Sequence, residues 1–409
     1  MPEIKPEIET VAKIKVVGVG GGGGSAVTRM IEADVKGVEF VAINTDLQAL
    51  QHNPASHKVH IGRTTTRGLG AGMDPALGRK SAEESQNEIR ELLKGTDLLF
   101  ITCGLGGGTG SGASPVVAEI AKEMGILTIA VVTKPFSFEG GPRRRIAEES
   151  LENLSQKVDT LITIPNDRIW QLIDKKTPLI DAFKVVDEVL RQGVQGISEL
   201  ITLPGLINVD FADVRAIMRS SGSALMGMGI ASGDNRAIEA AKAAVSSPLL
   251  EISVEGAKGI LFTIAGGESL TMYEVSEAAK VITESVDADA KIIFGAVHNE
   301  KLKDEIKITV VATGFDEKVA KENILKVKHE PINYFQAKSV PVKEEKEAVV
   351  EPDAASRTVS NFMTKPMNSA AAYHQAQEDA RVETPRRVVD DTANDDELDI
   401  PAFIRKKMM

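Results

Sequence analysis

The sequence predicts an α/β protein with a mostly parallel sheet, followed by a smaller α+β unit and a disordered tail. Short apolar, β-rich runs alternate with helix-like segments up to about residue 163, and a single long amphipathic segment follows them. Apolar periodicity then ends near residue 315. With 409 residues, of which 42% are hydrophobic, the chain is long enough to fill two cores.

Composition and charge exclude several classes of protein. The 48 Lys and Arg residues against 59 Asp and Glu residues give a net charge of -11, which argues against non-specific binding to nucleic acid or to an anionic membrane. The single cysteine, Cys103, excludes an internal disulfide, and the first ten residues lack the features of a secretion signal. No apolar run approaches the roughly 20 residues that cross a bilayer. We expect a cytoplasmic protein with no nucleic-acid partner and only indirect membrane contact.

The first domain is expected at 13–177, after a flexible segment at 1–12. Its apolar runs predict parallel strands covered by helices, and in such sheets ligands bind at the carboxyl ends of the strands. Both glycine clusters of the chain fall at such ends. The predicted strands lie at 13–20, 38–44, 97–103, 127–133 and 160–164.

A central helix is expected at 178–204. Apolar residues recur there at spacings of three and four, and Pro204-Gly205 ends the pattern. At about 1.5 Å per residue the helix would span about 40 Å, enough to connect opposite ends of a domain.

The region from 205 to 315 predicts a second, α+β domain. A helix is expected from about Asp210, and two strands in succession at the end of the region indicate a mixed sheet. The other elements are expected as strands near 223–232, 258–265, 290–298 and 307–313 and as helices near 235–245 and 271–284.

The remaining chain predicts a tether and a short motif. Residues 316–394 are charged and polar without apolar periodicity, which predicts a disordered linker. Residues 395–409 place Leu398, Ile400, Phe403 and Ile404 between acidic and basic ends, which favours a docking peptide. A frayed polar tail is the alternative.

The first glycine cluster, at 18–27, follows an apolar run and precedes a helical segment. This context suits a loop that binds phosphate or a dinucleotide. The cluster satisfies G-x-G-x-x-G, and Asp46 lies at about the distance where an NAD-binding domain places its ribose acid. An NAD-dependent oxidoreductase is therefore one alternative, and a tight turn without a ligand is another.

The second cluster, at 106–112, also follows an apolar run and begins a helix. A dinucleotide fold with a single glycine loop would not need it. Consecutive glycine amides at a helix N-terminus form an anion site, to which Thr109 and Ser111 add hydroxyl donors. We expect this arrangement to hold a triphosphate without the usual lysine.

Residues 72–81 superficially resemble a P-loop. Arg79 separates the glycine from the lysine, so the spacing G-x-x-x-x-G-K-[ST] is not met. We expect instead a helix that begins near Asp74, after a flexible loop at 68–72 close to the phosphates.

Three histidines, His52, His57 and His60, lie near one another in the sequence. They lack zinc-site spacing and a cysteine partner. We therefore expect them to be loop histidines and expect no metal site built from protein side chains.

The segment 208–214, NVDFADV, is far in sequence from both glycine clusters. Taken alone, it predicts that Asp210 caps a helix and that Asp213 occupies the first helical turn. A catalytic role for these carboxylates does not follow from the segment by itself.

Together these motifs resemble the tubulin/FtsZ family, whose GTPase domain is Rossmann-type. The resemblance extends from about residue 13 to 315 and resumes at the tail, and the motifs occur in order at the right spacing. They are GVGGGGG at 18–24, NTDLQAL at 44–50, GLGAG at 68–72, GGGTGSG at 106–112, FSFEGGPRR at 136–144, IPNDR at 164–168, NVDFADV at 208–214 and DIPAFIRK at 399–406.

The resemblance implies a site for GTP and GDP. Two small polar residues depart from the usual pattern, Ser25 where the family commonly has Asn and Ser111 where many members have Thr. Asp187 offers the carboxylate that accepts from guanine N1 and N2, and the spacing of Phe183 equally suits core packing. The implied contacts are Gly21, Gly22, Gly107, Gly108, Thr109 and Gly110 to the phosphates, Ala71 and Gly72 near the γ-phosphate, Glu139 and Arg143 to the ribose, and Asn166, Phe183 and Asp187 around the base, with Ser25 and Gly104 as further nucleotide-binding residues.

The resemblance also implies a shared active site, in which Asn208, Asp210 and Asp213 of one subunit complete the site of the next. Carboxylates beside a triphosphate repel it, so their supply from a neighbour ties hydrolysis to assembly. Head-to-tail contacts of this kind grow filaments, and Mg²⁺ is expected with the phosphates.

The implied role is a GTP-hydrolysing cytoskeletal protein concentrated at the division site, the division ring, of a bacterial cell. Membrane-anchoring adaptors and division regulators would bind through Asp399 to Lys406. The alternatives are the NAD-dependent oxidoreductase, which leaves 208–214 idle, and a nucleotide binder without hydrolysis, against which Asp210 and Asp213 argue.

Overall fold

The computed structural model describes residues 12–171, 176–202, 205–247, 254–287, 289–299 and 302–315. They lie in the first of the two units into which the chain divides, Met1–Ile332. The predicted linker at 316–394, the docking peptide at 395–409 and all but the last residue of the amino-terminal segment 1–12 lie outside the described residues.

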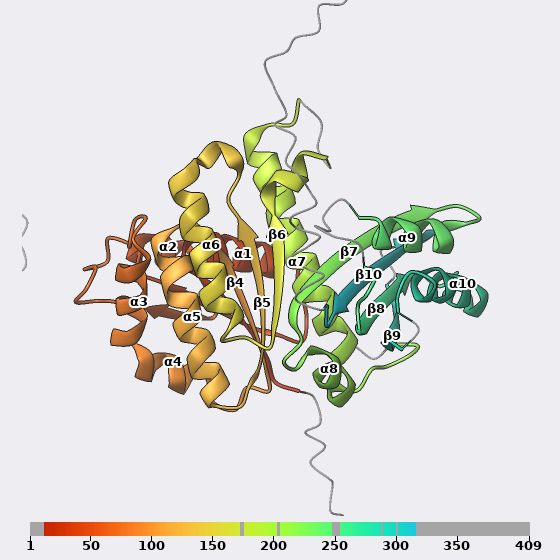
Figure 1. Ribbon diagram of the computed structural model, residues 1–409, viewed down its shortest axis with the longest axis horizontal. Helices are drawn as coiled ribbons and strands as arrows, with labels where there is room; N and C mark the ends of the chain where they lie inside the picture. Colours follow the sequence, from red (N-terminus) through yellow and green to blue (C-terminus); the bar gives the residue numbers. More distant parts are fainter. Residues whose placement is uncertain are drawn as a thin grey trace, which may run out of the picture. The chain divides into compact units, whose positions relative to one another are not determined.

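The described elements alternate strands with helices, as the sequence predicts for the first domain (Figure 1). The strands are β1 (Ile14–Val19), β2 (Glu39–Asn44), β3 (His57–His60), β4 (Leu98–Gly104), β5 (Leu127–Lys134), β6 (Thr160–Pro165), β7 (Gly222–Ser232), β8 (Gly259–Gly266), β9 (Lys291–His298) and β10 (Glu305–Thr313). The helices are α1 (Gly20–Glu32), α2 (Leu47–His52), α3 (Pro75–Glu84), α4 (Gln86–Leu93), α5 (Gly108–Glu123), α6 (Gly141–Ser155), α7 (Leu179–Thr202), α8 (Phe211–Met218), α9 (Arg236–Val245) and α10 (Met272–Thr283), with short 3-10 turns η1 (Ser137–Glu139) and η2 (Asn166–Gln171).

One sheet carries both parts of the fold, in the order β3-β2-β1-β4-β5-β6-β7-β10-β8-β9. The strands from β3 to β6 pair in parallel, which confirms the predicted α/β class. In the second part, β10 runs antiparallel to β7 and β8, and β9 pairs in parallel with β8, so the predicted mixed sheet is confirmed. The parallel pairing of β6 with β7, which joins the two parts, was not predicted.

Helices cover both faces of the parallel part. Val16 of β1 packs in one core, with side chains of α1, α7 and α8, whereas the next residue, Val17, packs in another, with side chains of α3 to α6. Adjacent residues of a strand point to opposite faces, and burial of both faces explains why the strand sequences are apolar throughout. A third core, with Phe262 of β8, lies under α9 and α10.

The long helix α7 confirms the predicted central helix. It has 24 residues, and in Figure 1 it lies between the strands of the parallel part and those of the second part. Its inner side chains, Val186, Val189, Leu190, Val194 and Ile197, are buried in the first core.

Two local predictions have different outcomes. Asp74 accepts from the amides of Ala76 (2.9 Å) and Leu77 (3.2 Å) and caps α3, so the helix start predicted there is confirmed. The prediction of loop histidines is wrong, because His52 ends α2 whereas His57 and His60 belong to β3. This strand is a short edge strand with mostly polar residues, and it therefore lacks the apolar run that predicts a strand.

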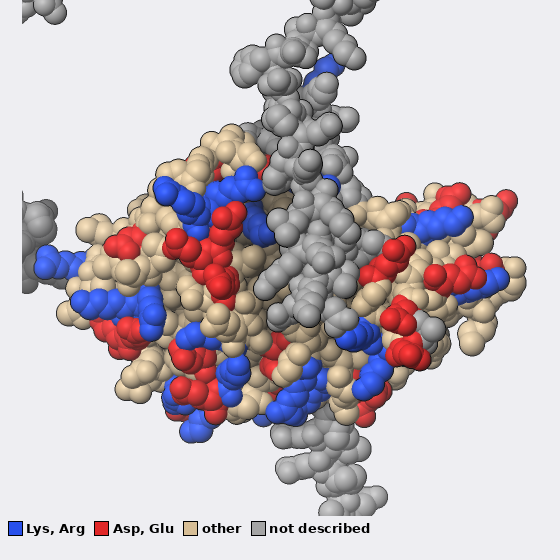
Figure 2. Space-filling view, viewed as in Figure 1, with Lys and Arg blue, Asp and Glu red and all other residues tan. Residues whose placement is uncertain are grey.

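The visible surface carries charges of both signs. Figure 2 shows Lys and Arg interspersed with Asp and Glu, in keeping with ion pairs such as Arg79 with Glu83 (2.8 Å) and Arg90 with Glu123. Among the described helices, none combines the length and the apolar character needed to span a membrane.

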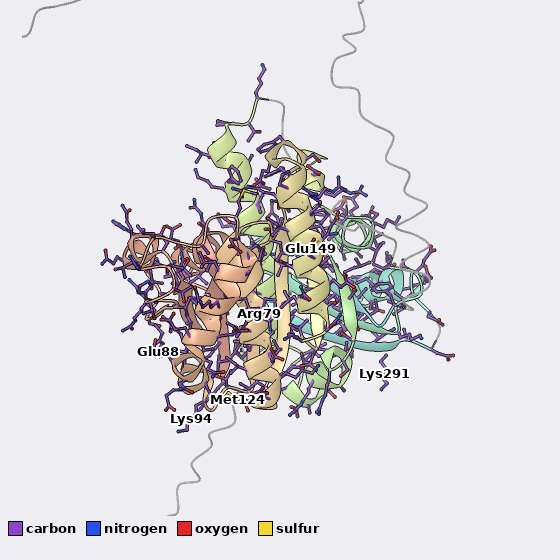
Figure 3. All side chains as sticks on the ribbon, turned by 60° about the vertical axis from the view of Figure 1, so that its left-hand side comes forward. Arg79, Glu88, Lys94, Met124, Glu149 and Lys291 are labelled. Carbon is purple, nitrogen blue, oxygen red and sulfur yellow. The ribbon has the colours of Figure 1, made fainter. Side chains whose placement is uncertain are left out.

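Helices α3 and α5 pack closely, because glycines leave no side chains where the two helices touch. Arg79 of α3 is labelled in Figure 3. A Cβ added to Gly112 of α5 would lie 2.0 Å from the carbonyl oxygen of Pro75 and 2.6 Å from the amide nitrogen of Arg79. A Cβ on Gly78 of α3 would lie 2.3 Å from the carbonyl oxygen of Gly108. These contacts hold the start of α5 directly against α3.

We expect Gly112→Ala to lower the free energy of unfolding by at least about 2 kcal/mol, because the added methyl group meets backbone that cannot move aside cheaply. Denaturant unfolding of the ligand-free protein measures this. Gly141→Ala is the matched control: nothing lies within 4 Å of the added Cβ at this first residue of α6, so we expect a change within about 0.5 kcal/mol. Equal stabilities of the two variants would contradict the close packing.

Candidate functional site

Two helices begin side by side at the carboxyl edge of the parallel sheet. No side chain caps the N-terminus of α1 or of α5, so neither helix uses a side-chain acceptor for its first amides. A Cβ on Gly20 would lie 2.8 Å from the Gly110 nitrogen, and one on Gly22 would lie 3.1 Å from the Gly104 nitrogen. The two glycine clusters therefore touch through their backbones, and the starts of two helices without side-chain caps lie together in a small volume suited to an anion.

The loop before α3 contacts the same place. The Gly108 amide donates to the Gly72 carbonyl oxygen at 2.7 Å, and a Cβ on Gly108 would lie 2.6 Å from the carbonyl oxygen of Ala71. The structure thus brings together three segments that are far apart in sequence, and each contains residues predicted at the phosphates.

Hydroxyl groups line this contact. The Thr109 hydroxyl lies 2.6 Å from the Thr45 hydroxyl, and both side chains are buried. The Ser111 hydroxyl accepts from the Gly106 amide at 2.9 Å, so Ser111 also fixes the shape of its own loop. Thr45 was not among the predicted site residues, although it directly follows β2 at the ligand-binding edge, and that position is the signal that would have found it.

Glu139 and Arg143 form a polar pair beside the second glycine loop. Their side chains lie 3.2 Å apart, and Glu139 also accepts from the Phe136 amide at 2.9 Å. A Cβ on Gly106 would lie 3.0 Å from the Arg143 carbonyl oxygen, so the pair lies next to the loop. A carboxylate held this way can accept hydrogen bonds from the hydroxyl groups of a sugar.

Phe183 has an exposed aromatic ring, and Asn166 has a hydrogen-bond acceptor without a partner among the described residues. Phe183, on α7, is 42% exposed and meets Phe136 edge to face, with ring centroids 5.7 Å apart, so it is not a residue of the buried core. Asn166 is only 6% exposed, yet its Oδ1 has no hydrogen-bond partner among the described residues. A buried acceptor without a donor is costly in a folded protein, and it suits a ligand that brings its own donor.

Asp187, one turn beyond Phe183 on α7, is a partly buried carboxylate. Its side chain is 18% exposed, and burial raises the pKa of Asp187 to about 6, although Arg29 of α1 opposes the rise. The Arg29 Nε and the Asp187 Oδ2 are 3.8 Å apart. This carboxylate therefore titrates close to neutral pH, which is common at functional sites.

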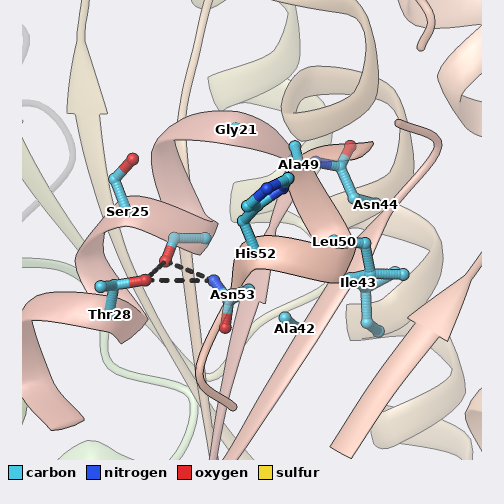
Figure 4. Close-up of a pocket in the computed structure, with 12 residues that line it drawn as sticks. Gly21, Ser25, Thr28, Ala42, Ile43, Asn44, Ala49, Leu50, His52 and Asn53 are labelled. Carbon is cyan, nitrogen blue, oxygen red and sulfur yellow. Dashed lines mark hydrogen bonds between the residues drawn. The ribbon is translucent and has the colours of Figure 1, made fainter. Parts of the chain in front are cut away.

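A cavity of about 190 Å³ lies between α1 and α2 (Figure 4). Gly21 and Ser25 of α1 line it, and Asn53 closes one side by donating to the Gly24 carbonyl oxygen (2.8 Å) and the Thr28 hydroxyl (3.3 Å). Asp46, the candidate ribose acid of a dinucleotide site, instead caps α2 by accepting from the Ala49 amide at 3.0 Å.

The segment at 208–214 lies elsewhere. Asp210 caps α8 by accepting from the Ala212 amide at 3.0 Å, which confirms the capping expected from the segment alone, and Asn208 accepts from the Gly205 amide at 2.6 Å. Asp213 is exposed in the first turn of the helix.

The carboxyl end of α8, at Met218, shows where this helix lies relative to the sheet. The hydroxyl of Thr160, the first residue of β6, donates to the Met218 carbonyl oxygen at 2.5 Å. Helix α8 therefore lies at the amino ends of the parallel strands, whereas the glycine loops lie at their carboxyl ends. Within one chain the structure does not bring Asn208, Asp210 or Asp213 to the glycine loops.

Comparison with known families finds two matches that together span most of the described chain. Residues 13–174 match the model of the Tubulin/FtsZ family, GTPase domain, and residues 222–316 match that of the FtsZ family, C-terminal domain.

Solved structures resemble the chain over the same region. An empty FtsZ dimer from M. jannaschii is 47% identical, with a TM-score of 0.73, and the match covers 75% of this chain and 89% of that one. A point mutant of FtsZ from M. jannaschii is also 47% identical, with a TM-score of 0.72 over 75% and 92% of the two chains. CetZ2 from Haloferax volcanii, a GTPγS-bound protofilament, is 23% identical, with a TM-score of 0.65 over 77% and 99%, and shares the fold.

Proposed function

The chain belongs to the tubulin/FtsZ family of cytoskeletal GTPases, and from this premise we propose that it assembles head to tail into filaments of the division ring and hydrolyses GTP where subunits meet. The observation that carries the proposal is the separation of its two half-sites. The glycine loops lie at the carboxyl edge of the sheet, and the exposed carboxylates of 208–214 lie at the other edge. The relative from M. jannaschii that is 47% identical is a dimer, which supports self-association.

In this proposal the helix amides and Thr109 bind the phosphates. The space in front of the loops supports this role, because a Cβ on Gly21 or on Gly107 would meet nothing within 4 Å. Glu139 and Arg143 bind the ribose, and Ala71 and Gly72 lie near the γ-phosphate. The proposed phosphate contacts are Gly21, Gly22, Gly104, Gly107, Gly108, Thr109 and Gly110, and among them the Gly108 amide also donates to the Gly72 carbonyl oxygen.

The base pocket is proposed to read guanine through two acceptors. Ionised Asp187 accepts from N1 and N2, and the unpaired Oδ1 of Asn166 accepts a further donor of the ligand. Phe183 stacks on the ring with its exposed face, and Ser25, which lines the cavity between α1 and α2, is a further proposed nucleotide contact. An NAD-dependent oxidoreductase is not favoured, because Asp46 is already engaged as a helix cap.

The catalytic half is proposed to come from the next subunit. Asp210 and Asp213, assisted by Asn208, orient and polarise the attacking water at the γ-phosphate of the neighbour. Two carboxylates beside a bound triphosphate within one subunit would weaken its binding, and a site completed by assembly avoids that cost. Mg²⁺ held by the phosphate oxygens would neutralise charge there.

We expect Asp187→Asn to change the preferred base. An amide oxygen accepts from N1, but the amide NH₂ faces the N2 donors of guanine, whereas xanthine offers an oxygen at that position. The variant should bind GTP at least about 30-fold more weakly, since a buried donor is left unpaired, and it should prefer XTP to GTP. Titration of both nucleotides at pH 7 measures this.

The pH dependence of GTP binding provides the control. The pKa of Asp187 is raised to about 6, so the carboxylate is ionised above that pH and protonated below it. Affinity of the unsubstituted protein should be nearly full well above pH 6, decline as the pH approaches 6 and fall by up to about tenfold per pH unit below it. Comparison with Asp187→Asn at each pH cancels the titration of the nucleotide itself, and equal profiles for the two proteins would exclude Asp187 as the reader of the base.

We expect two inactive variants to restore activity when mixed. Asp213→Ala keeps the glycine loops but lacks a carboxylate, whereas Asp187→Asn keeps the carboxylates but binds GTP poorly. Asp213 is suited to this test because its side chain is exposed and does not cap the helix. GTP turnover in the mixture should exceed the sum of the separate rates several-fold, because one variant supplies the pocket and the other the carboxylate.

Dilution supplies the second arm of this test. Turnover per subunit of the unsubstituted protein should fall on dilution through the assembly threshold, followed in parallel by sedimentation. A constant turnover per subunit, or a mixture with merely additive rates, would place the whole active site within one chain. Full activity of Asp213→Ala alone would leave that residue with a role in the helix only.

The remaining chain is proposed to connect the filament to the division site. The linker at 316–394 tethers a docking peptide at 395–409, whose segment Asp399 to Lys406 binds membrane-anchoring adaptors and regulators, so that contact with the membrane is indirect and the protein concentrates at the division site. The proposed domains are 13–177, 178–204 and 205–315, after the segment 1–12.

Deletion of 398–409 should leave GTP turnover within about twofold of the full chain, because every residue proposed for binding and hydrolysis lies before residue 214. In cells the truncated protein, fused to a fluorescent reporter, should lose its enrichment at the division site. Unchanged enrichment, or loss of turnover, would contradict the docking role.

A further inference from the structure

We propose that Thr45 is a positioning residue that sets the direction of the Thr109 hydroxyl proton toward the bound phosphate. The proposal rests on the proposed function of GTP binding. It adds a residue that contacts Thr109 and not the nucleotide itself. The observation is the 2.6 Å contact between two buried hydroxyl groups at the edge of the candidate phosphate site.

The contact has one consistent polarity when phosphate is bound. A phosphate oxygen only accepts, so Thr109 must donate its single proton to it. The oxygen of Thr109 then accepts, and Thr45 is the donor that faces it. A hydroxyl chain from Thr45 through Thr109 to the phosphate follows, and each bond in such a chain strengthens the next.

Thr45 is itself held firmly from two sides. Its carbonyl oxygen lies 3.1 Å from the His60 Nε2 at the end of β3, and the next residues pair with the loop before α3. Asp46 forms a backbone bridge with Leu69, and the Leu47 amide donates to the Gly68 carbonyl oxygen at 3.2 Å. The hydroxyl of Thr45 is therefore presented by a fixed backbone.

These contacts close a ring of three segments around the site. The segment at 45–47 binds the loop at 66–72, that loop binds Gly108 through the Gly72 carbonyl oxygen, and Thr109 returns to Thr45. Two of the three joints are backbone hydrogen bonds. The hydroxyl pair is the joint that a side-chain substitution can open without changing the backbone.

The test compares nucleotide affinity of full-length variants below the assembly threshold. Thr45→Val is isosteric and lacks the donor, and it should weaken GTP about fivefold, the size of one lost hydrogen-bond contribution. Thr45→Ser keeps the hydroxyl and should stay within about twofold of the unsubstituted protein. Thr45→Ala removes the donor without branching and replaces Thr45→Val if that variant does not fold.

Two controls separate positioning from general damage. Guanosine lacks phosphates, so its affinity should not change in Thr45→Val. In the Thr109→Val background, Thr45→Val should add no further loss, because the group that it orients is already absent.

The proposal is overturned if Thr45→Val binds GTP as well as the unsubstituted protein does, if it weakens guanosine equally, or if its effect adds in full to that of Thr109→Val. Failure of the unsubstituted protein to bind GTP would instead overturn the proposed function. Loss specific to the phosphates, rescue by Ser and absence of additivity together support the proposal.

Discussion

The fold depends on the close approach of two helix N-termini at one edge of a parallel sheet. Strands β1 and β4 are neighbours in register, with Val19 opposite Cys103, so the helices that follow them begin side by side. The strand order reverses between β1 and β4, because β2 and β3 follow on one side of β1 and β4 to β6 on the other. In open α/β sheets, ligands bind at the carboxyl edge beside such a reversal. Only backbone without side chains fits between the two helix starts, and the glycine clusters satisfy that constraint.

The parts that the sequence predicted are those with local causes. Strands buried on both faces produce apolar runs, and Asp74 and Asp210 mark helix starts by capping, so these elements follow from short windows. The pairing of β6 with β7 joins segments about 60 residues apart, and no local pattern specifies it. Strand β3 was not predicted. It lies at the edge of the sheet and is mostly polar, so it lacks the apolar run that indicates a buried strand.

The site was predicted in part for the same reason. Glycine loops have a recognisable composition, and the family motifs supplied the residues that we propose around the base. The spacing of Phe183 suited core packing, but its turn of α7 leaves the ring half exposed against Phe136. Thr45 lies in the NTDLQAL motif, but the motif alone gave it no role, and its proposed importance depends on a contact with a residue 64 positions away. Such a contact exists only after the sheet has formed.

The candidate site also accepts features that cost stability. Asp187 is partly buried with its pKa raised, and the Asn166 Oδ1 is buried with no partner among the described residues. Both costs disappear when a ligand supplies hydrogen-bond donors, and the guanine of the proposed function has such donors. The proposed division of the active site between two subunits agrees with the length of helix α7. Helix α7 spans about 36 Å from the proposed base pocket toward the carboxylate segment, so the two proposed halves face opposite ends of one subunit. A contact between unlike ends repeats without closing when each subunit is displaced along that direction, and a filament is its natural product.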